Sequence, residues 1–135
     1  MNTNTHGLPP AIEEHLKAGA TDAEMLGRTM RLLSRILPDD DVTVELPRTK
    51  DSTEKPQKYV RLRLKSASKS AAWIYPYGRV ELGLEHEDAG DYAELPCVRM
   101  IETVNPWRVE VTLSDAAAVL VADELIRTAL AKTAA

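Results

Sequence analysis

The chain has 135 residues, a formal net charge of -4 at pH 7, no phenylalanine and one cysteine. This length suits one domain, and a lone cysteine excludes both an intrachain disulfide and a zinc site built from several cysteines. The first twenty residues lack the basic and apolar segments of a secretory signal, and acidic residues interrupt the apolar stretch near the C-terminus. We therefore expect a cytoplasmic protein without a membrane partner.

The chain divides into a tail and a domain. Residues 1–20 predict a mobile tail with one short helical turn, in which Pro10 suits the first helical position. Residues 21–135 predict a single domain. It opens with a helix, because Thr21 and Glu24 have the spacing of a capping box and apolar residues recur at helical intervals up to Pro38.

Alternating apolar and polar residues predict an antiparallel sheet of about five strands. The stretches are VTVELP (42–47), YVRLRL (59–64), AAWIYPY (71–77), RVELGLE (79–85) and WRVEVTL (107–113). Pro76 and Gly78 in PYGR predict a tight turn between the third and fourth strands. The acidic segment 86–97 predicts a loop, and VRMIETV (98–104) fits either a strand or a helix.

A long helix is predicted from Asp115 to about Lys132, with Asp123 and Arg127 one turn apart on its solvent side. Its apolar stripe consists of Val119, Ala122, Leu125, Ile126 and Ala129. The strands are bracketed by helices and do not alternate with them. We therefore expect an α+β fold whose N-terminal helix and long C-terminal helix pack on one face of the sheet.

Two segments resemble a known family. The first segment is NPWRVEVTLSDAAAVLVADELIRTALAKT, and the second is YVRLRLKSASKSAAWIYPYGRVELGL. They resemble the YjbR/MmcQ-like α+β domains, and the resemblance covers about residues 21–133. They also resemble an uncharacterised domain of unknown function found fused to nuclease-like modules. The resemblance implies this fold, no agreed enzymatic activity and, for the YjbR-like group, a proposed DNA-binding role. The acidic segment and the negative net charge depart from a simple duplex-binding surface.

A basic strand, KYVRLRLK (58–65), is the main functional feature of the sequence. Its apolar side chains face one way and its cations the other. The cations are candidates for phosphate contacts and nearby aromatic rings for base stacking; the set is Lys58, Tyr59, Arg61, Arg63, Lys65 and Trp73. The alternative is a solvated, ion-paired face, with Glu45, Glu81 or Glu85 as partners on a neighbouring strand.

Two helical surfaces suggest further interpretations. Arg28, Arg31 and Arg35 share one stripe, which we interpret as a solvated helix face. The segment AAAVLVA (116–122) is apolar nearly all round, which is typical of a helix covered on two sides. With a sheet on one side, the other side predicts a homodimer contact.

No residue pattern predicts catalysis. His86 lies beside several carboxylates without the spacing of a metal site, and Cys97 has no glycine-rich elbow. We expect no catalytic residue, no metal site and no cofactor. The predicted function is a non-catalytic interaction or regulatory domain, with nucleic-acid binding through the basic strand as one interpretation. A homodimeric module without nucleic-acid binding is the alternative, and an enzyme of unrecognised class is a second alternative.

Overall fold

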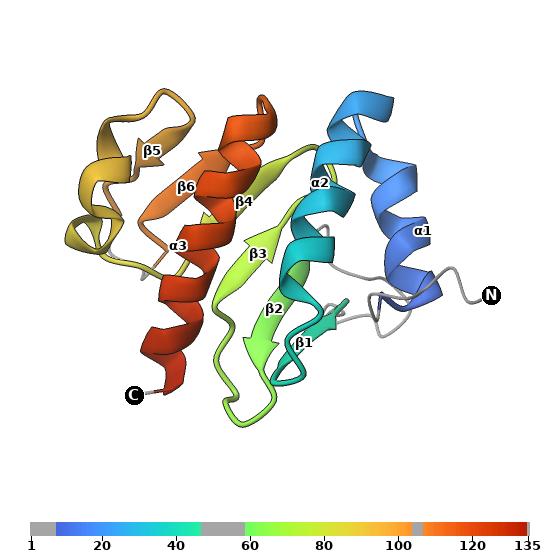
Figure 1. Cartoon of the computed structure of the whole chain (residues 1–135), viewed down its shortest axis with the longest axis horizontal. Coiled ribbons are helices and arrows are strands. Elements are labelled where there is room, and N and C mark those ends of the chain that lie inside the picture. The colour runs from blue at the N-terminus through green and yellow to red at the C-terminus, as the bar shows by residue number, and fades with distance from the viewer. Residues whose placement is uncertain (1–7, 47–58, 104–106, 135) are drawn as a thin grey trace.

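The computed structural model describes residues 8–46, 59–103 and 107–134. The elements in chain order are α1 (Pro10–Gly19), α2 (Ala23–Ile36), β1 (Val42–Glu45), β2 (Val60–Leu64), β3 (Ala72–Ile74), β4 (Arg79–Leu82), the 3-10 helix η1 (His86–Glu94), β5 (Val98–Met100), β6 (Val109–Thr112) and α3 (Ala116–Ala134). Figure 1 shows α2 and α3 lying across one face of the sheet, with α1 beside α2. The predicted α+β class is therefore confirmed.

The sheet has six strands in the order β1-β2-β3-β4-β6-β5, and all neighbouring strands are antiparallel. The strand beyond the predicted five is β5, which lies in the segment that fitted either a strand or a helix. The predicted turn between β3 and β4 is confirmed. The backbone N–H of Tyr75 donates to the carbonyl of Arg79 at 2.8 Å, and Gly78 has a φ of +91°.

The core lies between the sheet and the helices. Val60 and Leu62 of β2 are fully buried, while Arg61 and Arg63, which alternate with them, are half-buried on the opposite face. All five residues of the stripe predicted on α3 are buried. Each buried aliphatic side chain contributes about 1.5–3 kcal/mol to the stability of the fold, so the sheet face that packs on the helices, the inner face, fixes the sheet register. Polar and aromatic side chains occupy the opposite face, the outer face.

The N-terminal elements differ from the sequence prediction. The expected short turn is a ten-residue helix, α1, and its Ile12 and Leu16 belong to the core. The N-cap of α2 is Asp22, whose Oδ1 accepts from the Met25 N–H at 2.8 Å, so the capping box predicted at Thr21 is wrong by one residue. Burial of α1 residues gives this helix a stabilising contact that its isolated sequence does not show.

Asp123 joins the two long helices. Its side chain is only 3% exposed, and its two oxygens accept from Arg35 Nε of α2 and Arg127 Nε of α3, each at 2.8 Å. Arg127 also donates from Nη2 to the Arg35 carbonyl at 2.9 Å. The predicted pair of Asp123 and Arg127 forms, but its position on the solvent side is wrong, because α2 covers the carboxylate.

The acidic segment predicted as a loop forms η1. Asp88 accepts from the Glu85 N–H at 2.8 Å and from Lys132 Nζ at 2.6 Å, which ties η1 to the end of α3. The ammonium of Lys132 lowers the pKa of Asp88 below its usual value. Among the helices that the structure describes, none is both long and apolar enough to cross a membrane.

Candidate interaction surface

One row of directly paired residues crosses the outer face of all six strands. From β1 to β5 the residues of this row, the outer row, are Glu45, Arg61, Trp73, Glu81, Glu110 and Arg99. Residues opposite each other in a ladder are close enough for their side chains to interact. The outer row therefore brings together charges and rings from segments that are up to 65 residues apart in the sequence.

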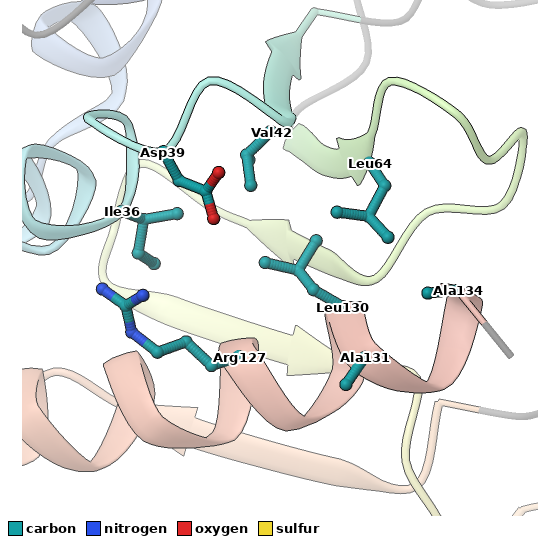
Figure 2. Close-up of a pocket in the computed structure, with 8 residues that line it drawn as sticks. All are labelled: Ile36, Asp39, Val42, Leu64, Arg127, Leu130, Ala131 and Ala134. Atoms are coloured by element: carbon teal, nitrogen blue, oxygen red, sulfur yellow. The ribbon is translucent and has the colours of Figure 1, made fainter.

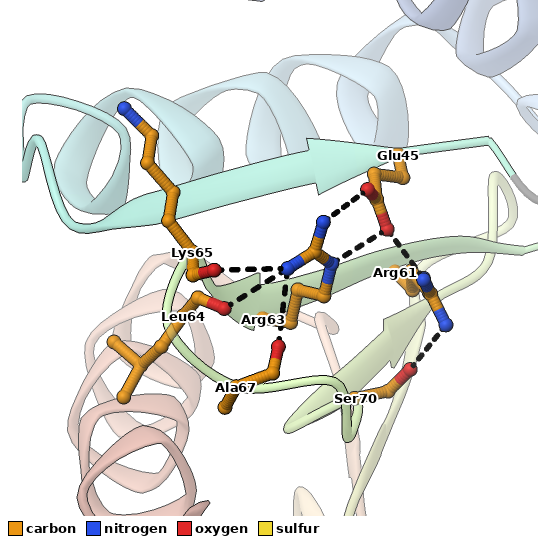
Figure 3. A network of polar contacts seen from close by, with 7 residues as sticks. All are labelled: Glu45, Arg61, Arg63, Leu64, Lys65, Ala67 and Ser70. Atoms are coloured by element: carbon orange, nitrogen blue, oxygen red, sulfur yellow. Dashed lines mark hydrogen bonds and ion pairs between the residues drawn. The ribbon is translucent and has the colours of Figure 1, made fainter. Parts of the chain in front are cut away.

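At one end of the outer row, two arginines share one carboxylate (Figure 3). Glu45 Oε1 accepts from Arg61 Nε at 2.6 Å, and Glu45 Oε2 accepts from Arg63 Nη2 at 2.7 Å. Arg63 Nη1 also donates to the carbonyls of Leu64 and Ala67. The hydrogen bond from Arg63 is the largest of the effects that lower the pKa of Glu45 to about 2. The ion-paired interpretation is thus confirmed for both arginines, with Glu45 as their partner.

The two candidate lysines are placed differently. Lys65 is exposed at the end of β2, and no ion pair of its ammonium group occurs within residues 8–46, 59–103 and 107–134. Lys58 lies outside the described residues. Among the candidate cations that the structure describes, Lys65 is therefore the one whose charge is least compensated.

Three aromatic rings form a continuous stack on the outer face. The Tyr59 and Trp73 rings have centroids 4.4 Å apart, and the Trp73 and Trp107 rings 4.0 Å apart, with interplanar angles of 18° and 25°. If Tyr59 and Trp107 were on the same side of the Trp73 indole, their rings would clash at these separations. They therefore lie on opposite sides and sandwich Trp73. A nucleic-acid base finds no free face on Trp73 in this arrangement.

An acidic pair in the middle of the outer row is a feature that the sequence analysis missed. Glu81 and Glu110 are directly opposite on β4 and β6, where like charges destabilise a sheet. Arg79 compensates them: its Nη2 donates to Glu81 at 2.6 Å, while its Nε is buried without a hydrogen bond, 3.7 Å from Glu110. Tyr75 donates to Glu81 at 3.2 Å, and burial with the Glu81 charge raises the pKa of Tyr75 to about 12.

The arginine stripe of α2 is not a uniform solvated face. Arg28 Nε donates to the Leu113 carbonyl at 2.6 Å, at the end of β6, and Arg35 binds Asp123. Only Arg31 has neither an ion pair nor a side-chain hydrogen bond within the described residues, and it is exposed. The interpretation as a solvated stripe is therefore wrong for Arg28, which is half-buried, whereas Arg35 is exposed and also pairs with Asp123. Both contacts were hidden because they span 85 and 88 residues.

The apolar surface of α3 is mostly covered. Ala118, Val119, Val121 and Ala122 are buried, and Leu120 is the only large apolar residue of α3 that is exposed, at 51%. A single leucine makes a small patch. The geometry of α3 thus gives no support to the homodimer contact predicted on this helix.

An apolar groove of about 320 Å³ lies on the helical side, where α2 ends and α3 continues (Figure 2). It is lined by Ile36, Asp39, Val42, Leu64, Arg127, Leu130, Ala131 and Ala134. Pro38 stops α2 before it covers the end of β2, which leaves Leu64 half-buried. The groove therefore lies where α2 no longer covers the sheet beside α3.

The residues weighed for catalysis or metal binding are not brought together. His86 Nε2 is 2.9 Å from the Ile101 carbonyl, and burial raises the pKa of the Cys97 thiol, which disfavours the reactive thiolate. No three His, Cys, Asp or Glu side chains in the described parts of the chain form a group suited to a metal ion.

Comparison with known family models, curated proteins and solved structures finds no match to this chain. The resemblance to YjbR-like domains stays a prediction.

Proposed function

We propose that this domain is a non-catalytic interaction module that associates with a second copy of itself through the outer face of the sheet. The observation that supports the proposal is the charge order of the outer row. Read from β1 to β5 it is acid, base, ring, acid, acid, base, as Glu45, Arg61, Trp73, Glu81, Glu110 and Arg99 stand in the sheet. Read in reverse, the same row sets Arg99 against Glu45 and Glu110 against Arg61.

A two-fold axis parallel to the strands, between β3 and β4, superposes the outer row on its own reverse. Glu45 then faces the second copy's Arg99, and Arg61 faces the second copy's Glu110. A symmetric dimer needs such a self-complementary surface. The aromatic stack and the arginines are also the residue types enriched in protein interfaces. Two sheets packed face to face leave about 10 Å for these side chains.

Arg99 is the residue of choice for testing the proposal, because its side chain is 74% exposed and lies on the edge strand. We expect a dimer at tens of micromolar concentration by light scattering or sedimentation velocity. Arg99→Glu should weaken it by about tenfold or more, because it sets a like charge against the second copy's Glu45 at both ends of the interface. The matched control is Arg31→Glu, which reverses an exposed cation on the helical side and should leave the dimer unchanged. A monomer at high micromolar concentration overturns the proposal.

Nucleic-acid binding is the second candidate function, and Lys65 favours it. The group formed by Glu45, Arg61 and Arg63 keeps one positive charge, and the exposed Lys65 adds another next to it. Phosphate binding must weaken steeply with salt, so the test is oligonucleotide fluorescence anisotropy from about 50 to 200 mM salt. Lys65→Glu should then lower the affinity of single strands while leaving the dimer intact. Absence of binding to single and double strands at low salt overturns this candidate.

A further inference from the structure

A pocket of about 470 Å³ opens at the end of the sheet where α3 ends. Its walls come from the β2–β3 connection, the residues after β4, the residue two positions before β6 and the last turn of α3. The lining residues are Lys69, Ser70, Gly83, Glu85, Trp107, Lys132 and Thr133. This volume lies in the range of sites that hold small organic ligands.

The pocket has cations and hydroxyl groups on opposite walls. Lys69 and Ser70 lie on the sheet side, and Lys132 and Thr133 lie on the helix side. Lys69 is exposed and has no ion pair within the described ranges, so its charge is available to a ligand. The ammonium groups and the Ser70 hydroxyl provide hydrogen-bond donors for an anionic oxygen, whereas the Thr133 hydroxyl donates to the Leu130 carbonyl at 2.8 Å.

The polar groups of the pocket are held in position by neighbours. The Asp88 carboxylate anchors the Lys132 ammonium at 2.6 Å and leaves its other two protons for a second acceptor. Arg108 Nη1 donates to Glu85 Oε1 at 2.6 Å, which fixes a carboxylate on the pocket wall. The second oxygen of Glu85 therefore offers an acceptor for a hydroxyl or amino group of a ligand.

Trp107 provides the flat apolar wall. Its ring stacks on Trp73, which also stacks on Tyr59, so the indole is fixed before a ligand arrives. Gly83 lies beside it, and a Cβ built on Gly83 would be 3.7 Å from Trp107 Cζ3. A rigid indole edge next to a residue without a side chain suits a planar ring.

We infer that this pocket binds a planar aromatic molecule that carries an anionic group and a hydroxyl or amino donor, the class to which mononucleotides belong. The ring packs against Trp107, the anion lies between Lys69 and Lys132, and the donor reaches Glu85. The site shares Trp107 with the aromatic stack of the outer face, whereas none of its charged residues belongs to the outer row.

Titration calorimetry and tryptophan fluorescence with AMP, GMP, CMP and UMP test the inference on the full chain. We expect saturable binding of at least one of them below about 1 mM. Inorganic phosphate alone and the uncharged nucleoside should each bind at least tenfold more weakly, because each lacks half of the recognised chemistry. A nucleoside that binds as well as its nucleotide, or no saturation with any of the four, overturns the inference.

Two variants locate the site. Lys69→Glu should weaken nucleotide binding at least tenfold, whereas Lys17→Glu, at an exposed position of α1, should have no effect. Gly83→Val places a branched side chain beside Trp107, where the added Cβ would be 3.7 Å from its nearest neighbours, and thermal unfolding checks that the fold is retained. Binding that survives Gly83→Val in a variant with unchanged thermal unfolding contradicts this location.

Discussion

The contact of Asp123 with Arg35 and Arg127 leads to a prediction about coupling between two substitutions. Asp123 is buried, while the arginine side chains are 46% and 47% exposed. Replacing either arginine by methionine keeps most of its aliphatic stem and leaves the carboxylate with one charged partner. Replacing both leaves a buried carboxylate with no cation.

The expected free energies follow from this difference. A single replacement removes one charge-assisted hydrogen bond to a half-exposed guanidinium, which costs about 1 kcal/mol. Arg127→Met should be the larger of the two, because Arg127 also donates to the Arg35 carbonyl. The double replacement leaves an uncompensated buried charge, which costs about 3–5 kcal/mol. The double variant should therefore lose about 2 kcal/mol more than the sum of the single variants.

Urea unfolding of the four proteins at pH 7 measures this coupling, since guanidinium chloride would screen the ion pairs. Adding Asp123→Asn to the double variant should restore about 1–2 kcal/mol, because it removes the unpaired charge. Lys17→Met is the matched control: the exposed pair of Lys17 with Glu13 should contribute less than about 0.5 kcal/mol. Single-variant effects that add within about 0.5 kcal/mol refute the reasoning.

Three other changes test the sheet. Glu45→Gln should cost about 1–2 kcal/mol at pH 7. Because the folded pKa of Glu45 is about 2 against a usual 4.5, the difference from wild type should shrink as pH falls from 4.5 toward 2 in urea unfolding. The raised pKa of Tyr75 should decrease stability between pH 10 and 12, and Glu81→Gln should lower that pKa in a phenolate absorbance titration. Thermal unfolding of Gly78→Ala should show a loss of about 2 kcal/mol or more, because φ is positive and Met25 fills the space, whereas Gly27→Ala on α2 should gain about 0.5–1 kcal/mol.

The sequence predicts those parts of the fold that depend on local periodicity. The strand alternation, the Gly78 turn and the apolar stripe of α3 are confirmed because each is encoded within a few adjacent residues. The strand β5 was ambiguous because it has only three residues and pairs with β6 alone. The burial of Asp123 was not predictable, since the helix that covers it lies almost ninety residues away in the sequence.

The candidate surface shows the same division between local and long-range information. The alternation of side chains along a strand predicts that Arg61 and Arg63 point away from the core. Their ion-pair partner, however, depends on which strand is adjacent. The antiparallel β1 sets Glu45 against Arg61, so one carboxylate compensates two cations. A basic strand therefore does not by itself make a strongly basic face, because Glu45, Glu81 and Glu110 share the outer face with the arginines. Affinity for phosphate on this face then depends on cations without an acidic partner, such as Lys65, while the order of acids and bases within the row suits a second copy of the same surface.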